Sequence, residues 1–162
     1  MRTVPKFTFG VGDRFGQSAT SQLSAFVRAR QAGIELVPIW NKSNREHLIV
    51  GSEPAATRAA ADQAVAELGW DGEYLLDADH INLDTVDRYV PHCDFFTLDV
   101  ADVIGEAADA TTLESFVERH PELIGQFGIT REDVEATARQ FLAATHSAGE
   151  IYRHILERKG GI

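Results

Sequence analysis

The sequence predicts an α/β fold with about four parallel strands, and three observations support this class. Short apolar segments alternate with segments of helical periodicity through roughly the first 100 residues. Polar or glycine-rich clusters follow the apolar segments, as at the carboxyl ends of parallel strands. From residue 111 onward the pattern is only helical. This order fits half of a (β/α)8 barrel of the TIM type or one edge of a doubly wound sheet.

Four apolar segments are the expected strands. They are residues 6–9, 34–40, 74–76 and 94–100. In the first, apolar and polar residues alternate, which is the period of a half-buried strand. Pro38 lacks a backbone N–H, so it bends the second strand or places it at an edge.

Helices are expected between these strands. Ser18 or Thr20 can cap the first helix, which Gly33 ends. The second, rich in alanine, begins near Pro54 and stops at Gly69. Helical spacing and end signals therefore place one helix after each of the first two strands.

The remaining chain is expected to be helical outside the fourth strand. A short helix covers residues 84–89. Thr111 and Glu114 form a capping box, and Thr130 begins a long amphipathic helix. No linker or repeat interrupts the chain, so we expect one α/β unit over residues 1–162 with a helical tail at about 111–159.

Length and composition indicate an ordinary globular domain. The chain has 162 residues, 44% of them hydrophobic and 25% charged. No apolar run approaches the roughly 20 residues of a membrane span, and the amino terminus lacks the features of a signal peptide. With Cys93 as the single cysteine, no internal disulfide forms, and we expect a cytoplasmic protein without membrane partners.

Charge is distributed unevenly along the chain. The net charge is −10, which disfavours nucleic-acid partners because these require clustered cations. Residues 1–50 nevertheless hold seven Lys and Arg against three Asp and Glu, whereas residues 51–162 hold eight against twenty-two. We therefore expect an anionic small molecule to bind in the first third of the chain.

The sharpest chemical motif follows the third expected strand. Asp77 and Asp79 lie on one side of a strand by its period of two, and His80 comes directly after them. Two carboxylates and an imidazole can hold a divalent metal and leave one carboxylate as acid or base. Alternatively, Asp79 caps a helix and His80 is an ordinary surface histidine.

A second cluster follows the second expected strand. It combines cations, amides, a hydroxyl and an imidazole over seven residues: Asn41, Lys42, Ser43, Asn44, Arg45, Glu46 and His47. A polyhydroxylated anion requires such a mixture, since cations bind its carboxylate and amides or hydroxyls bind its oxygens. An ordinary solvated loop is the alternative.

Three further candidate residues lie after the first expected strand or within the fourth. The segment 10–16 is glycine-rich but lacks the spacing of a dinucleotide-binding motif. Within it, Asp13 and Arg14 either contact a ligand or pair with each other. Asp99, in the fourth expected strand, is the last candidate for substrate binding.

Several of these segments together resemble the tagaturonate epimerase family. They are residues 9–16, 40–47, 51–54, 77–82 and 94–102. The resemblance implies a cytoplasmic, metal-dependent enzyme that interconverts the sugar acids tagaturonate and fructuronate. It also implies a barrel like that of class II aldolases, so we expect the amino-terminal portion of a (β/α)8 barrel, about four parallel strands followed by helices.

The resemblance also assigns roles at the third strand. Asp79 and His80 match the aspartate–histidine dipeptide of those aldolases, in which histidine binds zinc and aspartate is the acid or base. Zinc is therefore the expected cofactor, with manganese or nickel as alternatives. Family members are longer than this chain, so the resemblance covers their amino-terminal part and places the remaining metal ligands further along the family's sequence.

These residues and the resemblance are compatible with three functions. The first is epimerisation by a retro-aldol route, in which a carbon–carbon bond opens and closes again on the other face. The second is a class II aldolase-like lyase, and the third is a non-catalytic domain that binds a sugar acid or a metal. The apolar stripe of the last helix, which includes Val134, Leu142 and Ile151, requires a partner surface, so we expect this helix to fold back over the sheet or to pair with a second copy of the chain.

Overall fold

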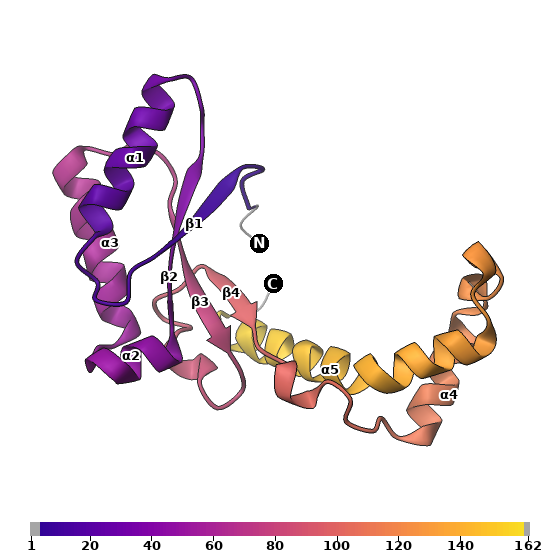
Figure 1. The fold of residues 1–162 in the computed structure, drawn as a ribbon. Coiled ribbons are helices and arrows are strands. Elements are labelled where there is room, and N and C mark those ends of the chain that lie inside the picture. Colours follow the sequence, from indigo (N-terminus) through magenta and orange to yellow (C-terminus); the bar gives the residue numbers. More distant parts are fainter. Residues whose placement is uncertain (1–3, 161–162) are drawn as a thin grey trace. The chain divides into compact units, whose positions relative to one another are not determined.

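The computed structural model describes residues 4–160 and contains a four-stranded parallel sheet (Figure 1). Its strands are β1 Thr8–Gly12, β2 Val37–Ser43, β3 Leu75–Ile81 and β4 Phe95–Leu98. They lie in the order β1-β2-β3-β4, each parallel to its neighbours. The α/β class with about four parallel strands is confirmed.

The strand order distinguishes between the two architectures left open by the sequence. In a doubly wound sheet the order reverses at a switch point, whereas strands of a barrel follow one another in sequence. Here each strand pairs with the next along the chain. Figure 1 accordingly shows α1 Ala19–Gln31 and α3 Pro54–Leu68 on the same face of the sheet. The arrangement is that of a TIM-barrel-like half.

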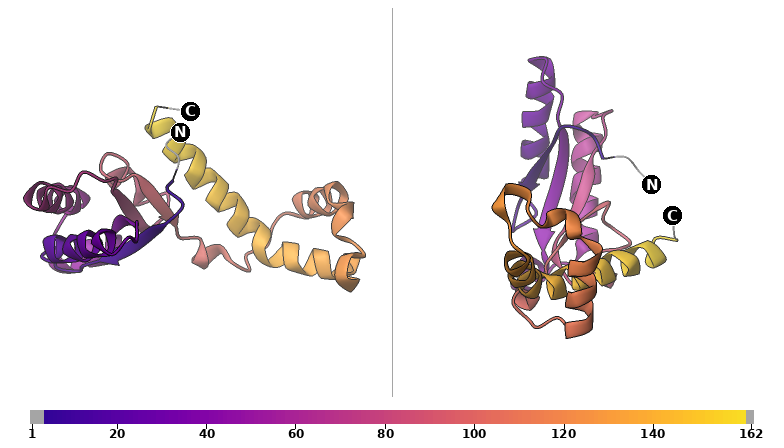
Figure 2. Two further views of the ribbon diagram at one scale, coloured as in Figure 1. Left: turned by 90° about the horizontal axis from the view of Figure 1, so that it is seen from above. Right: turned by 90° about the vertical axis from the view of Figure 1, so that its right-hand side faces the viewer.

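The chain divides into two compact units. The first contains the sheet up to Leu98 and the end of α5 from His154, and the second contains residues 99–153. The second unit holds α4 Ala110–Arg119 and most of α5 Arg131–Arg158, which Figure 2 shows side by side. The apolar residues between them include Phe116, Val134 and Phe141. Among the described residues, no helix is long and apolar enough to cross a membrane.

Several expected boundaries were wrong. The strands begin later than expected, and β2 and β3 extend through polar residues, because pairing between the two strands continues there whatever the polarity of the side chains. The cluster 41–47 is no loop, since β2 runs to Ser43 and α2 Asn44–Val50 follows. Ser43 and Glu46 form a capping box that starts this helix, in place of the expected loop.

Other helix starts also differ from the sequence expectation. Asp109 caps α4 through the backbone N–H of Thr112, so the expected capping box of Thr111 is not the start of this helix. Residues 86–88 form a single 3-10 turn, η1, within the short helix that was expected. At α5, Thr130 and Asp133 exchange side-chain and backbone hydrogen bonds, which confirms the start expected there.

The sheet has an outer face against the helices and an inner face opposite. On the outer face, the indole nitrogen of Trp40 donates to Gln22 of α1 at 3.0 Å, and Ala78 is fully buried. Because side chains alternate along a strand, Asn41 and Asp77 lie on the inner face.

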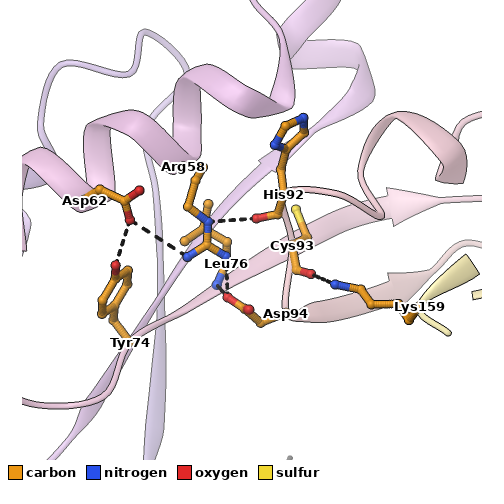
Figure 3. A network of polar contacts seen from close by, with 8 residues as sticks. All are labelled: Arg58, Asp62, Tyr74, Leu76, His92, Cys93, Asp94 and Lys159. Atoms are coloured by element: carbon orange, nitrogen blue, oxygen red, sulfur yellow. Dashed lines mark hydrogen bonds and ion pairs between the residues drawn. The ribbon is translucent and has the colours of Figure 1, made fainter. Parts of the chain in front are cut away.

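Arg58 of α3 ties the helix layer to the starts of β3 and β4 (Figure 3). Its guanidinium lies 2.5 Å from the carboxylate of Asp94, which also accepts the backbone N–H of Leu76, and its Nε donates to the carbonyl of His92 at 2.9 Å. Tyr74 donates to Asp62 at 2.7 Å, completing what we call the Arg58 network. These contacts explain how α3, β3 and β4 are held together at their polar edges.

Candidate active site

Register places the candidate site on the inner face at the carboxyl ends of the strands. Gly12 pairs with Asn41, and Asn41 pairs with Asp77, so the three residues form one row across β1, β2 and β3. Asp79 is paired with Ser43 one step nearer the carboxyl ends. In barrels of this kind, ligands bind at this edge.

Asp77 is a buried carboxylate with only one of its oxygens engaged. Asp77 is 8% exposed. Its Oδ2 accepts a hydrogen bond of 2.7 Å from the hydroxyl of Thr97 on β4. Oδ1 is buried and has no partner among the described residues. Burial raises the pKa of Asp77, and the nearby charge of Asp79 adds to this, while the Thr97 bond opposes it. Such a group is equipped to exchange a proton with a ligand.

Asp79 and His80 form a hydrogen-bonded pair next to it. Nδ1 of His80 lies 2.7 Å from Oδ1 of Asp79. The register of β3 and β4 slips between Ala78 and Ile81, and His80 adopts a left-handed backbone with φ of 54°. This conformation is uncommon outside glycine and turns the imidazole, 64% exposed, away from the regular strand. Backbone strain of this type concentrates at functional sites.

The pair suits one position of a metal site. Metal-bound histidines commonly direct their second ring nitrogen to a carboxylate, as Nδ1 does here toward Asp79. Nε2 of His80 would then be the ligand atom. Residues 4–160 contain no group of three His, Cys, Asp or Glu side chains able to hold a metal together. The described part of the chain therefore offers His80 as a candidate ligand but no complete metal site.

The cluster at residues 41–47 separates over both faces. Asn41 lies on the inner face beside Asp77, whereas Lys42 is 4% exposed and lies on the outer face. Lys42 donates to the hydroxyl of Ser52 at 2.9 Å, and the same hydroxyl lies 2.9 Å from Nδ1 of His47. Burial lowers the pKa of Lys42. This placement directs Lys42 toward the α2–α3 connection and away from the face that carries Asp77.

His47 is part of the protein core. It is 1% exposed, and its ring packs edge-on against Tyr89 at 5.9 Å between centroids. Burial, reinforced by the charges of Lys42 and Arg88, lowers its pKa to about 4. The imidazole is therefore uncharged at neutral pH, and the contact supports packing of α2 on the chain after β3.

The other members of the cluster have separate surroundings. Ser43 caps α2, and Oδ1 of Asn44 accepts a hydrogen bond of 2.5 Å from Arg88, whose other amino group bonds Glu53 at 2.8 Å. Arg45 is exposed and makes no hydrogen bond or ion pair within residues 4–160. Of the cations in this cluster, Arg45 is the one that solvent and ligands can reach.

Asp13 and Arg14 do not pair with each other. The carboxylate of Asp13 accepts backbone N–H groups from Phe15, Gln17 and Ser18 at 3.0, 2.5 and 2.6 Å. Burial opposes its ionisation, but these bonds outweigh that effect and leave the pKa of Asp13 below its usual value. Arg14 lies 3.5 Å from Glu46. Asp13 therefore shapes the turn between β1 and α1.

Asp99 falls outside the sheet. The expectation that it belongs to the fourth strand was wrong, because β4 ends at Leu98 and Asp99 begins the second unit. Its carboxylate accepts the backbone N–H of Ala101 at 3.1 Å. The first peptide N–H of the following 3-10 turn thus holds this side chain.

Three partners of the candidate residues were not anticipated. Thr97 bonds Asp77, Ser52 joins Lys42 to His47, and Arg88 holds Asn44. Thr97 was detectable in principle, since it stands two residues after Phe95, which pairs with Asp77, and so shares its face. The other two depend on chain segments packed together only by the tertiary fold.

Comparison with protein families decides the relationship. The model of the tagaturonate epimerase family matches residues 2–158. The chain belongs to the tagaturonate epimerase family. No curated protein sequence gives a significant match. The family expected from the strings around Asn41 and Asp77 is therefore confirmed over almost the whole chain.

Solved structures show the same fold. The chain is similar to the native structure of a fructuronate-tagaturonate epimerase from Cohnella laeviribosi, with a TM-score of 0.73 and 20% identity. The match covers 96% of this chain and 35% of that one. A complex of the same epimerase with one glycerol gives the same values, and one with two glycerols gives a TM-score of 0.72. This chain thus spans about a third of the length of the solved relative.

Proposed function

We propose that the protein acts as a sugar-acid epimerase that converts tagaturonate to fructuronate. The observation that carries the proposal is the buried Asp77 with its free oxygen, on the inner face beside the Asp79–His80 pair. Family membership supplies the substrate class. Because the chain spans 35% of the solved relative, the rest of the site is expected from sequence that corresponds to the remainder of that protein.

A retro-aldol route explains what these residues would do. The epimerised carbon bears a hydroxyl group. Removal of the hydroxyl proton allows the adjacent carbon–carbon bond to break. The electrons of that bond are retained by the fragment that carries the ketone. When the bond forms again on the other face, the same proton returns to the oxygen, so atoms and charge balance and no external oxidant is needed.

Asp77 is the better placed of the two carboxylates to move this proton. Each carboxylate has one oxygen engaged, but the remaining oxygen of Asp77 is buried without a partner in the described chain, whereas the Asp79 side chain is 20% exposed and is paired with His80. Thr97 fixes the other oxygen of Asp77 and so orients the free one. Asp79 then acts on the imidazole, by holding its tautomer and ring orientation.

A divalent metal bound through His80 would supply positive charge for the oxygens of the reacting ketone. Zinc suits a neutral imidazole ligand, and manganese or nickel are the alternatives. This chain's own part is to present Nε2 of His80, with Nδ1 bound by Asp79.

Product analysis tests the proposal against a class II aldolase-like lyase. Incubated with tagaturonate, the full-length protein is expected to yield fructuronate of the same carbon number. Release of three-carbon fragments would instead identify a lyase. Tagaturonate binding without any product would support the non-catalytic sugar-acid-binding alternative.

Metal content tests the role of His80. His80→Ala is expected to lower the bound zinc measured by atomic emission after exhaustive dialysis, with melting temperature retained. His120→Ala is the matched control, because His120 is likewise paired through Nδ1 with a carboxylate, that of Glu122 at 2.9 Å. An unchanged metal stoichiometry in His80→Ala would contradict the assignment.

A further inference from the structure

The inner face carries a polar row that the sequence motifs did not reveal as a unit. Gly12, Asn41 and Asp77 pair across three adjacent strands, and we call them the polar row. Neighbouring strands lie about 4.8 Å apart, so the row extends roughly 10 Å from β1 to β3. One step toward the amino ends, Gly10 pairs with Ile39 and Ile39 with Leu75, so the adjacent row is apolar.

Backbone conformation does not require glycine at the β1 end of the row. Gly10 and Gly12 are absent from the positions of positive φ, and both lie within a regular parallel strand. A Cβ at Gly12 would stand 2.5 Å from Oδ1 of Asn41, whereas a Cβ at Gly10 would reach only ordinary contact, at 4.0 Å from Nδ2. Gly12 thus provides the space that the Asn41 amide occupies.

Both polar side chains of the row have unused hydrogen-bonding groups. The Asn41 amide makes no side-chain hydrogen bond within the described chain, and Oδ1 of the buried Asp77 has no partner there either. A buried carboxylate oxygen without a partner costs free energy unless a ligand or water satisfies it. Glycine within a strand often marks close approach of a ligand. The two observations are independent and indicate the same surface.

We infer that the polar row binds hydroxyl groups of an open-chain polyhydroxylated ligand laid across β1 to β3. In this subsite Gly12 is a specificity-determining residue, because it allows the Asn41 amide to lie flat over β1 while Asp77 accepts from a neighbouring hydroxyl. The inference rests on the proposed function only for the identity of the natural ligand, a sugar acid. An amide offers both a donor and an acceptor, which suits a hydroxyl group better than a carboxylate.

A pair of alanine substitutions isolates Gly12. Calorimetric titration of the full-length protein with tagaturonate is expected to show at least tenfold weaker binding for Gly12→Ala and a change below twofold for Gly10→Ala. Both substitutions add one methyl group to the same strand face, so loss of strand flexibility is matched. Melting temperatures of the two variants should agree within about 2 °C, on the scale of a surface substitution.

A double-mutant cycle tests whether Gly12 acts through Asn41. Asn41→Ala should weaken tagaturonate binding by itself, and adding Gly12→Ala to it should weaken binding no further. If Gly12→Ala fails to fold, Asn41→Ala alone decides, since it leaves β1 unchanged. Equal affinity of Asn41→Ala and the unaltered protein would overturn the inference.

Ligand chemistry is tested by the side-chain amide signal of Asn41 in nitrogen-15 spectra. Tagaturonate and the uncharged polyol galactitol should both shift it, and acetate should not; a shift by acetate alone would overturn hydroxyl recognition. Tagaturonate that binds at Asn41 without being converted would refute the proposed function and leave the subsite intact. If tagaturonate is converted and Gly12→Ala binds it with unchanged affinity, only the subsite is refuted. The subsite is also refuted if neither tagaturonate nor galactitol shifts the Asn41 amide signal.

Discussion

At the starts of β3 and β4, the charged side chains of the Arg58 network are mutually paired, whereas at the carboxyl ends Asp77 keeps an oxygen without a partner. Both regions are partly buried and both connect β3 with β4 or the residue before it; Figure 3 shows the Arg58 network. Burial opposes the charge of Arg58, yet its ion pair with Asp94 raises its pKa. At Asp77 the nearby charge of Asp79 adds to the effect of burial.

This difference indicates which edge of the sheet serves stability and which serves chemistry. A network whose polar groups are all paired lowers the free energy of the folded state and leaves few donors or acceptors for a ligand. An unsatisfied carboxylate is costly to the fold and becomes useful when a ligand completes it. Substitutions at the two edges should therefore affect different measurements.

The largest expected effect separates activity from stability at the carboxyl end. Asp77→Asn should reduce turnover of tagaturonate by about 10²-fold or more, the scale of a lost acid or base. Its free energy of unfolding should stay constant or rise, because a buried charge is removed. Fructuronate formation and urea denaturation measure the two quantities. Turnover within twofold of the unaltered protein would show that Asp77 does not move the proton.

His47 provides a test by pH, because it lies beside β2 yet belongs to the core. Its pKa of about 4 is below the unfolded value of about 6.5, so the unfolded state binds more protons between these values. The contribution of His47 to the free energy of unfolding should be fully present above about pH 6.5. It should be lost as the pH falls toward 4, by at most about 3 kcal/mol. Urea denaturation at several pH values measures this slope. His47→Asn should flatten it, and an unchanged slope would contradict the assignment.

Arg58→Met should reveal the opposite pattern from Asp77→Asn. It leaves Asp94 without its cation while both side chains are about a quarter exposed, so we expect a loss of about 2 kcal/mol in the free energy of unfolding. Turnover per folded molecule should stay within twofold. Arg30→Met is a control, because Arg30 pairs with the exposed Asp71 and should contribute less. A large fall in turnover of folded Arg58→Met would remove the distinction between the two edges.

The smallest effect is expected at Arg45. Because it is exposed and unpaired within residues 4–160, Arg45→Gln should change the free energy of unfolding by less than about 0.5 kcal/mol. Affinity for tagaturonate should fall by roughly threefold to tenfold if this cation binds the carboxylate. Arg139→Gln in the second unit is the control. If instead Lys42→Met weakens binding with stability preserved, Lys42 is the cation that the ligand reaches.

Much of the fold followed from local pattern. Alternating apolar and helical segments, with end signals such as Pro54 and Gly69, were sufficient to predict parallel strands and their connecting helices. The polar segments Asn41–Ser43 and Asp77–His80 were not expected to belong to strands, because pairing with neighbouring strands overrides local polarity. Strand order, which distinguishes a barrel half from a doubly wound sheet, is a tertiary property.

The site was predicted unevenly for the same reason. Residue types identified Asp77, Asp79 and His80, and strand alternation gave the shared face of the two aspartates. Composition alone could not divide residues 41–47 between two faces, because that requires the limits of β2 and α2. The close approach of the Asn41 amide to Gly12 could not be predicted from the sequence, because it depends on the register between β1 and β2.

The consecutive strand order has a consequence for how the chain is made. Each strand finds its partner in the strand synthesised just before it, so the sheet can grow in one direction as the polypeptide leaves the ribosome. The backbone carbonyl of Cys93, by contrast, accepts from Lys159, 66 residues later. The segment that leads into β4 therefore gains this contact only after the whole of α5 has been synthesised, so a hydrogen bond of the sheet unit depends on one of the last residues of the described chain.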